Sequence, residues 1–316
     1  MSTAPVPPRD GADLMGSGDG ADLMGSGDGA DLMGSRGGAD PMAGRLIAHL
    51  RKALPSGRLG VAYSGGVDSA LLCAAAVRAL GPDRVLALLA VSDSLAARER
   101  RLAHATAESI GVPLAEVVTH EGEVAGYADN GADRCFFCKN ELFTVIDEQL
   151  VAQYGLAAVA YGENADDRLR PDRPGARAAT AHRVLRPLAD CGVTKAQVRA
   201  LARAWGVPVA DKPAAPCLAS RIPHGDPVTA EKLHQIDAAE DVVLAAGFSD
   251  ARVRHHGPVA RIEVPADELG RLADAALRRR LVEGVRAAGF RFVTLDLAGI
   301  QSGAFTLPLV AAGHHD

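Results

Sequence analysis

The chain has 316 residues, of which 48% are hydrophobic, and its formal net charge is −5. This length and composition predict a globular protein with about two domains, and the acidic balance argues against a large nucleic-acid-binding surface. The sequence shows neither a basic segment followed by an apolar run at its start nor an apolar stretch that would span a bilayer, so we expect no signal peptide and no membrane association.

The N-terminal segment contains a nonapeptide repeat, DGADLMGSG, within residues 10–45. Gly/Asp nonapeptides can form a calcium-binding β-roll, but here the Gly and Asp phasing differs from that pattern and the copies are few. A Gly- and Ser-rich segment of this kind does not bury enough surface to offset its ordering entropy. Residues 1–42 are therefore predicted to be a disordered tail.

The next part of the chain alternates between segments of helical periodicity and short apolar segments typical of strands. In chain order, the expected helices cover residues 43–54, 67–80, 94–111, 139–155 and 194–206, and the expected strands cover 58–64, 84–92, 114–120 and 156–162. Such alternation indicates an α/β domain with a parallel sheet between helices. We expect this domain to cover residues 43–210.

A Pro-rich connector at 207–227 precedes a second series of elements. A helix is expected at 228–247, strands at 251–256 and 259–265, a helical stretch at 266–289 and a strand at 290–297. This order predicts a smaller α+β domain over residues 211–305 for substrate binding or oligomerisation, with a tail at 306–316.

The motif SGGVDS lies between the first expected strand and the helix that follows it. Glycines let a backbone approach a phosphate, and the free N–H groups of a helix start favour an anion. The motif lacks the Gly-Lys-Ser/Thr ending of a Walker loop and the Gly spacing of a dinucleotide fingerprint. A tight strand-to-helix turn with Asp68 as a capping acid is the structural alternative.

The motif CFFC raises the question of what two thiols three residues apart do in a chain with only 5 Cys. The scattered cysteines form no disulfide framework, and reduced thiols fit a cytoplasmic protein. Zinc would need further ligands, and a thioredoxin-type pair has small residues or Pro between its cysteines. Two interpretations stay open: Cys135 and Cys138 are buried core thiols, or they join a distant thiolate on a 4Fe-4S cluster.

Cys217 is the distant thiol with the most unusual surroundings, because it lies in the Pro-bounded segment PAAPCLASRIPHG. A cysteine that only packs in a core usually lies in an apolar element. Cys73 in ALLCAAA and Cys191 in LADCGVT are small core or surface residues by their context, and we assign them no role.

SGGVDS resembles the pyrophosphate-binding loop of the PP-loop ATP pyrophosphatases, which include the NAD, GMP and asparagine synthetases. The resemblance implies an adenine nucleotide α-hydrolase-like fold that binds ATP with Mg²⁺. Together with DRCFFCKNELF, YGENADDRLRPDRPGARAA, PAAPCLASRIPHG and ARVRHHGPVARIEVP, it is similar to the LarE family of sulfur transferases. This family makes the nickel-pincer nucleotide cofactor of lactate racemase, and the similarity covers about residues 43–305.

The LarE resemblance implies that the enzyme adenylates each carboxylate of pyridinium-3,5-biscarboxylic acid mononucleotide and replaces the activated oxygen with sulfur. In one type of family member the Cys of the PCLASR motif, here Cys217, gives up its own sulfur and becomes dehydroalanine. In the other type this Cys joins the CxxC pair, here Cys135 and Cys138, to hold a 4Fe-4S cluster with an extra sulfide. Because all three cysteines are present, we expect the cluster type.

The remaining site residues follow from the two motifs and from the ends of expected strands. The residues expected to bind ATP are Ser64, Gly65, Gly66, Asp68, Ser69, Gly162, Asn164 and Asp167. The residues expected to bind substrate are Arg221, Arg252, Arg254, Glu240 and Glu263. Arg252 and Arg254 are two apart in a strand and so share a face, where a pair of guanidinium groups can bind a phosphate.

Two other functions remain as alternatives. A PP-loop tRNA thiolase would also combine ATP with cluster-binding cysteines, but the acidic net charge counts against it. A non-catalytic ATP-binding or iron-sulfur carrier protein is the second. The expected partner is a nicotinate-derived mononucleotide, with no nucleic acid, an unidentified sulfide donor and, by the resemblance, a homo-oligomer such as a hexamer.

Overall fold

The computed structural model describes residues 40–169 and 174–301. Its first part contains these elements in chain order: α1 Pro41–Ala53, β1 Arg58–Tyr63, α2 Val67–Leu80, η1 Pro82–Arg84, β2 Val85–Val91, α3 Ala97–Ile110, β3 Leu114–Val118, η2 Glu121–Glu123, α4 Ala125–Ala128, α5 Arg134–Val145, η3 Ile146–Leu150, α6 Val151–Tyr154, β4 Leu156–Tyr161, α7 Ala165–Arg168, α8 Pro174–Ala181, α9 Pro187–Asp190 and α10 Lys195–Ala204.

The chain continues with η4 Leu218–Arg221, α11 Ala230–Ala245, β5 Arg252–His256, β6 Val259–Glu263, η5 Ala266–Ala273, α12 Ala275–Ala287 and β7 Phe292–Leu295. No described helix is both long enough and apolar enough to cross a membrane. The repeat copies before residue 40 and the tail at 306–316 lie outside the described residues.

The first sheet has four parallel strands in the order β3-β2-β1-β4. In its centre Val61 of β1 pairs with Ala87 of β2 on one side and with Ala160 of β4 on the other. The chain runs outward from β1 through β2 to β3 and then returns to the far side of β1. In open α/β sheets, this reversal of strand order places the ligand crevice at the carboxyl ends of the two strands concerned.

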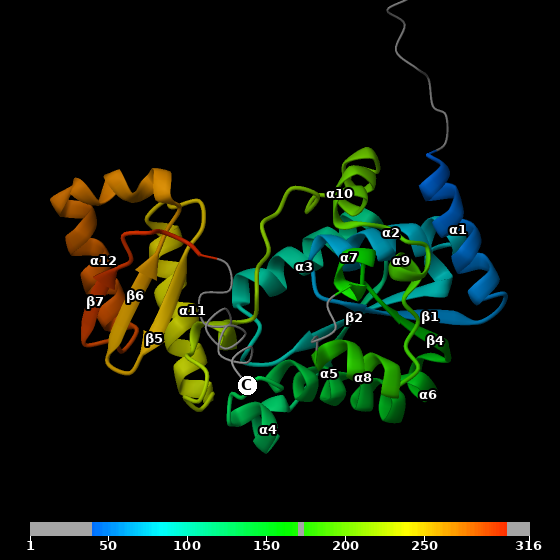
Figure 1. Ribbon diagram of the computed structural model, residues 1–316, viewed down its shortest axis with the longest axis horizontal. Helices are drawn as coiled ribbons and strands as arrows, with labels where there is room; N and C mark the ends of the chain where they lie inside the picture. Colours follow the sequence, from blue (N-terminus) through cyan, green and yellow to red (C-terminus); the bar gives the residue numbers. More distant parts are fainter. Residues whose placement is uncertain (1–39, 170–173, 302–316) are drawn as a thin grey trace, which may run out of the picture. The chain divides into compact units, whose positions relative to one another are not determined.

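Helices cover both faces of this sheet (Figure 1). On one face, α1, α2 and α10 pack over β1 with residues such as Leu46, Leu71 and Leu201. On the other face, α5, η3 and α8 pack over β2 and β4 with residues such as Phe143 and Ile146. The predicted α/β fold class with a parallel sheet is therefore confirmed.

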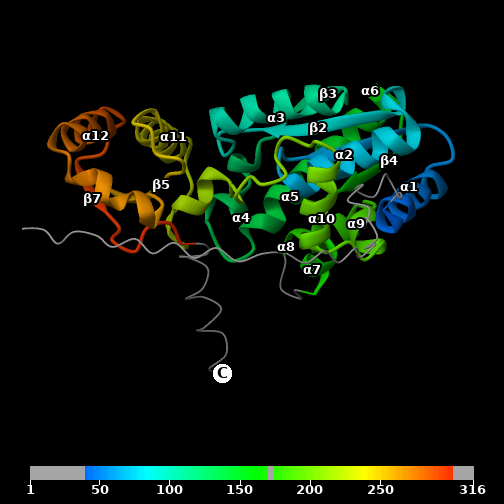
Figure 2. The ribbon, with the colours of Figure 1, turned by 90° about the horizontal axis from the view of Figure 1, so that it is seen from above.

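The second sheet is small and mixed: β5 and β6 are antiparallel, and β6 and β7 are parallel. Helices α11 and α12 lie on the same side of it (Figure 2) and form a separate core with Val253, Ala260 and Ile262. The predicted order of helix, two strands, helix and strand is found. The boundary between the domains at residue 210 stays a prediction.

Two of the larger differences from the sequence-based expectation concern helices. The helix expected from residue 139 begins at Arg134 and so includes the CFFC motif in its first turns. The helical stretch expected over 266–289 is divided into a 3₁₀ segment and α12, because the Asp274 side chain caps α12 by accepting from the backbone N–H of Leu277 at 2.7 Å.

Candidate active site

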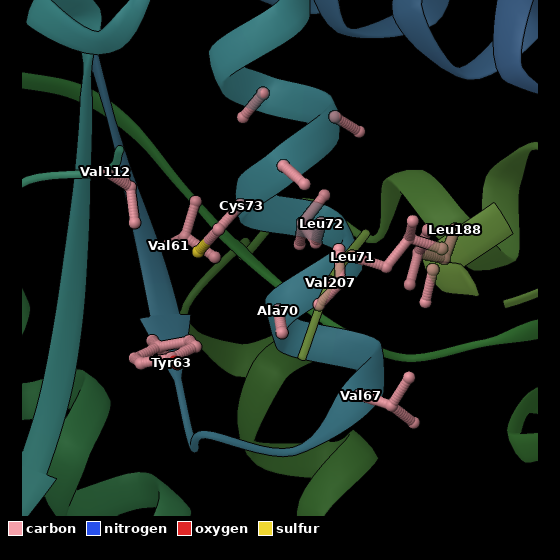
Figure 3. Packing of buried hydrophobic residues seen from close by; sticks show 14 of the residues in the cluster. Val61, Tyr63, Val67, Ala70, Leu71, Leu72, Cys73, Val112, Leu188 and Val207 are labelled. Carbon is pink, nitrogen blue, oxygen red and sulfur yellow. The ribbon is translucent and has the colours of Figure 1, made fainter. Parts of the chain in front are cut away.

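The SGGVDS motif forms the turn between Tyr63 at the end of β1 and Val67 at the start of α2 (Figure 3). Gly65 has a φ of +70°, which L-residues rarely adopt, and a Cβ there would lie 2.9 Å from the Ala103 side chain. The Ser69 hydroxyl accepts from the Ser64 backbone N–H at 3.1 Å and donates to the Gly66 carbonyl at 3.0 Å. The turn therefore presents the N-terminus of α2 to an anion. Residues 64–69, which are predicted to bind phosphate, are called the phosphate-facing turn below.

Gly162 follows β4 and touches the same helix start. A Cβ at this position would lie 2.7 Å from the backbone nitrogen of Ser69 and 2.9 Å from the carbonyl carbon of Asp68. Only glycine lets the end of β4 approach the first turn of α2 this closely. The contact joins the neighbouring strands β1 and β4 at the predicted ligand crevice.

We expect Gly162→Ala to destabilise the protein by about 1–3 kcal/mol, because the new methyl group must push α2 away from β4. The same displacement should weaken ATP binding, since it moves the phosphate-facing turn. Urea unfolding and calorimetric titration with ATP would measure both effects.

The matched control is Gly44→Ala in α1, where a Cβ meets no atom within 4 Å. That change should stabilise the helix by about 0.5–1 kcal/mol. Equal effects of the two substitutions would contradict the close-approach argument.

The Asp68 side chain is held by two residues from distant parts of the chain. Asn164 Nδ2 donates to Asp68 Oδ1 at 3.1 Å, and Lys195 Nζ donates to Asp68 Oδ2. Asn164 also caps α7 by accepting from the backbone N–H of Asp167 at 3.1 Å, and it donates to the Asp167 carboxylate at 2.9 Å. The predicted ATP-binding residues after β1 and β4 thus form one connected group.

A cavity of about 540 Å³ opens at these strand ends. Its lining includes Ser64, Asp68, Ser69, Gly162 and Asp167 of the predicted ATP site. It also includes all three predicted sulfur-site cysteines and Arg221. The structure therefore brings the phosphate-facing turn and the three thiols to one cavity, although the contacts of these residues with ATP or substrate stay predictions.

Cys135 and Cys138 lie three apart in α5, which places both on the face of the helix that lines the cavity. Cys217 precedes η4 and reaches the same cavity from the connector. Burial raises the pKa of the Cys138 thiol, and the negative charges of Glu121 and the other two cysteines add to this. Burial also raises the pKa of Cys217, although Arg134 and Arg221 act in the opposite direction.

Raised pKa values mean that these thiols resist ionisation in their protein surroundings, whereas binding to a metal ion favours the thiolate form. Within residues 40–169 and 174–301, no three His, Cys, Asp or Glu side chains are grouped so that they would hold one metal ion. The ligands of a 4Fe-4S cluster do not have to meet at one metal ion, because each cysteine binds a separate iron atom. Three thiols that line one cavity fit this donor set.

The segment that carries Cys217 is anchored to the first sheet's domain. The backbone N–H of Leu218 donates to the Ser94 carbonyl at 2.9 Å, and the Arg134 guanidinium donates to the Ala219 carbonyl at 3.0 Å. Arg134 lies directly before Cys135 in α5. One side chain therefore ties the helix of the paired thiols to the connector of the third thiol.

Arg221 and Glu240, both predicted to bind substrate, form a buried ion pair. Arg221 Nε donates to Glu240 Oε1 at 2.8 Å, while its Nη1 donates to the carbonyls of Pro216 at 2.6 Å and Cys217 at 3.2 Å. Burial opposes ionisation of Glu240, but Arg221 and then Arg98 outweigh it and lower the pKa of this carboxyl group. The pair fixes the backbone at Cys217, and of the two residues only Arg221 lines the cavity.

Arg252, Arg254 and Glu263 extend this network across the second sheet. Arg254 pairs with both oxygens of Glu263, at 3.0 and 2.8 Å, and donates to the Ser220 carbonyl at 3.1 Å. Arg252 donates to the Ala214 carbonyl at 3.0 Å. Both arginines of β5 thus contact the connector on either side of Cys217, and neither they nor Glu263 line the cavity.

Sequence reasoning missed several residues of this site, among them Lys195, Arg98, Arg134 and Glu121. Lys195 and Arg98 are paired with partners far away in the sequence, so no local pattern indicates them. Glu121 did carry a signal, because a polar residue just after a parallel strand lies at the ligand-binding edge of the sheet.

Comparison with known proteins agrees with this geometry. The NAD synthase family model matches residues 49–133. An uncharacterized protein of Synechocystis is 40% identical over 77% of this chain and 90% of its own length. Pyridinium-3,5-bisthiocarboxylic acid mononucleotide synthase of Lactiplantibacillus plantarum is 32% identical over 81% of this chain and 91% of its own length. The chain belongs to the family of this synthase, the LarE family.

Membership in the LarE family and the NAD synthase match together support an ATP-using enzyme. A more distant relative, an uncharacterized protein of Methanocaldococcus jannaschii, is 23% identical over 80% of this chain and 94% of its own length. The matches reach well beyond the phosphate-facing turn. The fold class and the LarE family resemblance expected from the motifs are therefore confirmed.

Proposed function

We propose that this LarE family protein adenylates the carboxylates of pyridinium-3,5-biscarboxylic acid mononucleotide and converts them to thiocarboxylates. The observation that carries the proposal is that one cavity is lined by both the phosphate-facing turn and three thiols. A substrate carboxylate oxygen attacks the α-phosphorus of ATP, and pyrophosphate leaves. Sulfur then replaces the activated oxygen at the acyl carbon, and AMP leaves with that oxygen.

The groups for the first step lie at the carboxyl ends of β1 and β4. Backbone N–H groups at the start of α2 face the phosphates, and the Ser64 and Ser69 hydroxyls lie beside them. The carboxylates of Asp68 and Asp167 line the cavity and are the oxygen ligands that Mg²⁺ prefers. Their role is to hold the ion against the ATP phosphates as charge develops on the leaving pyrophosphate.

For the sulfur source, we infer that Cys135, Cys138 and Cys217 hold a 4Fe-4S cluster. Bound there, such a cluster would supply an exchangeable sulfide as the source of sulfur. Arg134 and Arg221 provide positive charge near Cys217. Arg134 of α5 donates to the Ala219 carbonyl and Arg221 donates to the Pro216 carbonyl, so both hold the segment that carries this cysteine. Direct donation of sulfur by Cys217 is the second candidate, favoured by the position of this residue in the lining of the cavity.

The test is anaerobic incubation of iron- and sulfide-reconstituted protein with MgATP and the dicarboxylate mononucleotide. We expect one AMP and one pyrophosphate for each thiocarboxylate formed, measured by chromatography and mass spectrometry. Release of pyrophosphate with tRNA but not with the mononucleotide would support a thiolase instead. Absence of pyrophosphate with any pyridinium carboxylate nucleotide would leave a carrier protein.

A further inference from the structure

Glu121 is a buried carboxylate in the cavity that the proposed chemistry does not use. It follows β3, lines the cavity and is only 3% exposed. The hydroxyls of Ser92 and Ser94 both donate to its Oε1 atom, at 2.5 and 2.8 Å. Its Oε2 atom is shielded from solvent and has no hydrogen-bond partner among the described residues. A buried polar atom without a hydrogen-bond partner is rare in folded proteins and therefore needs a physical explanation.

Glu121 also differs from three other carboxylates that line the cavity, because each of those has a cationic ion-pair partner. Asp68 is paired with Lys195, Glu99 with Lys212, and Glu163 with Arg186. For Glu121, the described part of the chain supplies no cationic partner within ion-pair distance. A buried charge without a counter-charge is unfavourable, and its field acts strongly because the surrounding medium is poorly polarisable.

The position of Glu121 in the cavity is at the thiol end. The 3₁₀ segment η2 that carries Glu121 packs against α5, because the backbone N–H of His120 donates to the Glu141 side chain of α5 at 3.4 Å. Glu121 lines the same cavity as Cys135 and Cys138 of that helix. In the proposed reaction, the substrate carboxylate must reach these thiols. The ring that bears this carboxylate then lies within the field of Glu121.

We propose that Glu121 selects the positively charged pyridinium ring of the substrate. A quaternised ring nitrogen carries charge but no N–H donor, so it is recognised through its charge and not by a hydrogen bond. A shielded carboxylate held by two serine hydroxyls is suited to this, because it supplies a fixed negative field without competing as a direct ligand. This inference rests on the proposed function and adds a specificity-determining residue to it.

The test compares two ligands of nearly equal size, nicotinic acid mononucleotide, whose ring is cationic, and its dihydro form, whose ring is neutral. Calorimetric titration of the full-length protein gives both affinities without any turnover. We expect the wild type to bind the cationic form about tenfold more tightly, an effect typical of one partly buried charge interaction. Glu121→Gln should lose this preference by weakening only the cationic ligand.

The matched control is Glu123→Gln on the same 3₁₀ segment, because the Glu123 side chain is 84% exposed and lies outside the cavity. It should bind both ligands as the wild type does. Thermal unfolding of each variant checks that the fold is intact. If Glu121→Gln does not fold, the ratio of the two affinities in the wild type still decides the inference.

Equal affinity of the wild type for the two ligands, or an equal loss of both in Glu121→Gln, would overturn the role of Glu121 and leave the proposed function standing. Failure of the wild type to bind either mononucleotide would be a different result. It would count against the proposed function itself, and the inference would fall with it.

Discussion

Replacing Cys217 with alanine is expected to reduce thiocarboxylate formation to below about one thousandth of the wild-type rate. Cys217 lines the cavity with the phosphate-facing turn and is the thiol that both candidate sulfur sources require. Adenylation does not need it, so exchange of labelled pyrophosphate into ATP should persist in the presence of substrate. Cys191→Ala is the matched control, because this half-buried thiol does not line the cavity.

The variants Cys135→Ala and Cys138→Ala separate the two sulfur sources. If a 4Fe-4S cluster carries the sulfide, each variant should lose the bound iron, the visible absorption of the reconstituted protein and repeated turnover. If Cys217 donates its own sulfur, the variants should keep a single turnover, and the wild type should lose the mass of H₂S as Cys217 becomes dehydroalanine. Full activity of Cys217→Ala would contradict both mechanisms.

Replacing Glu240 with glutamine is expected to lower the free energy of unfolding by about 3–5 kcal/mol. The Glu240 side chain is fully buried, pairs with Arg221 and Arg98, and accepts from the backbone N–H of Val253 at 3.0 Å. A neutral side chain leaves the buried Arg221 guanidinium without the carboxylate it pairs with, whereas Arg98 keeps Asp237 and Asp241 nearby. Chemical denaturation at neutral pH would measure the loss.

Asp241→Asn provides the control for this change, because Asp241 approaches Arg98 at 3.8 Å but is 46% exposed. An exposed pair of this kind should contribute less than about 1 kcal/mol. Since folding lowers the pKa of Glu240, its contribution is complete above the ordinary value of 4.5 and declines as the pH falls below it. A difference between wild type and Glu240→Gln that does not shrink in acid would argue against the ion pair.

The fold class was predictable because short segments of the sequence indicate their own helix or strand. Helical periodicity alternates with apolar runs from α1 to β4, and parallel strands follow from that alternation. The start of α5 was misplaced because Arg134, Cys135 and the two Phe residues show no helical pattern when viewed alone. Their helix is stabilised by packing: α5 contributes Phe143 to the core beneath β2 and β4.

The candidate site was only partly predictable. The turn around Ser64 and the three cysteines could be identified because motifs mark them, and they do line one cavity. The buried network of Arg221, Glu240 and Arg98 depends on pairs distant in sequence, so it became visible only in the fold. The sequence indicated chemically active residues, but not that several of them also hold the Cys217 connector in place.

The anchoring of this connector affects when the enzyme can become competent during its synthesis. The paired thiols of α5 emerge from the ribosome well before Cys217, and the anchors Glu240, Arg252 and Arg254 emerge later still. A nascent chain that has folded only its first sheet displays two thiols without the third. Because residues of α11 and β5 hold the connector, Cys217 is fixed in the cavity lining only after most of the polypeptide has been made.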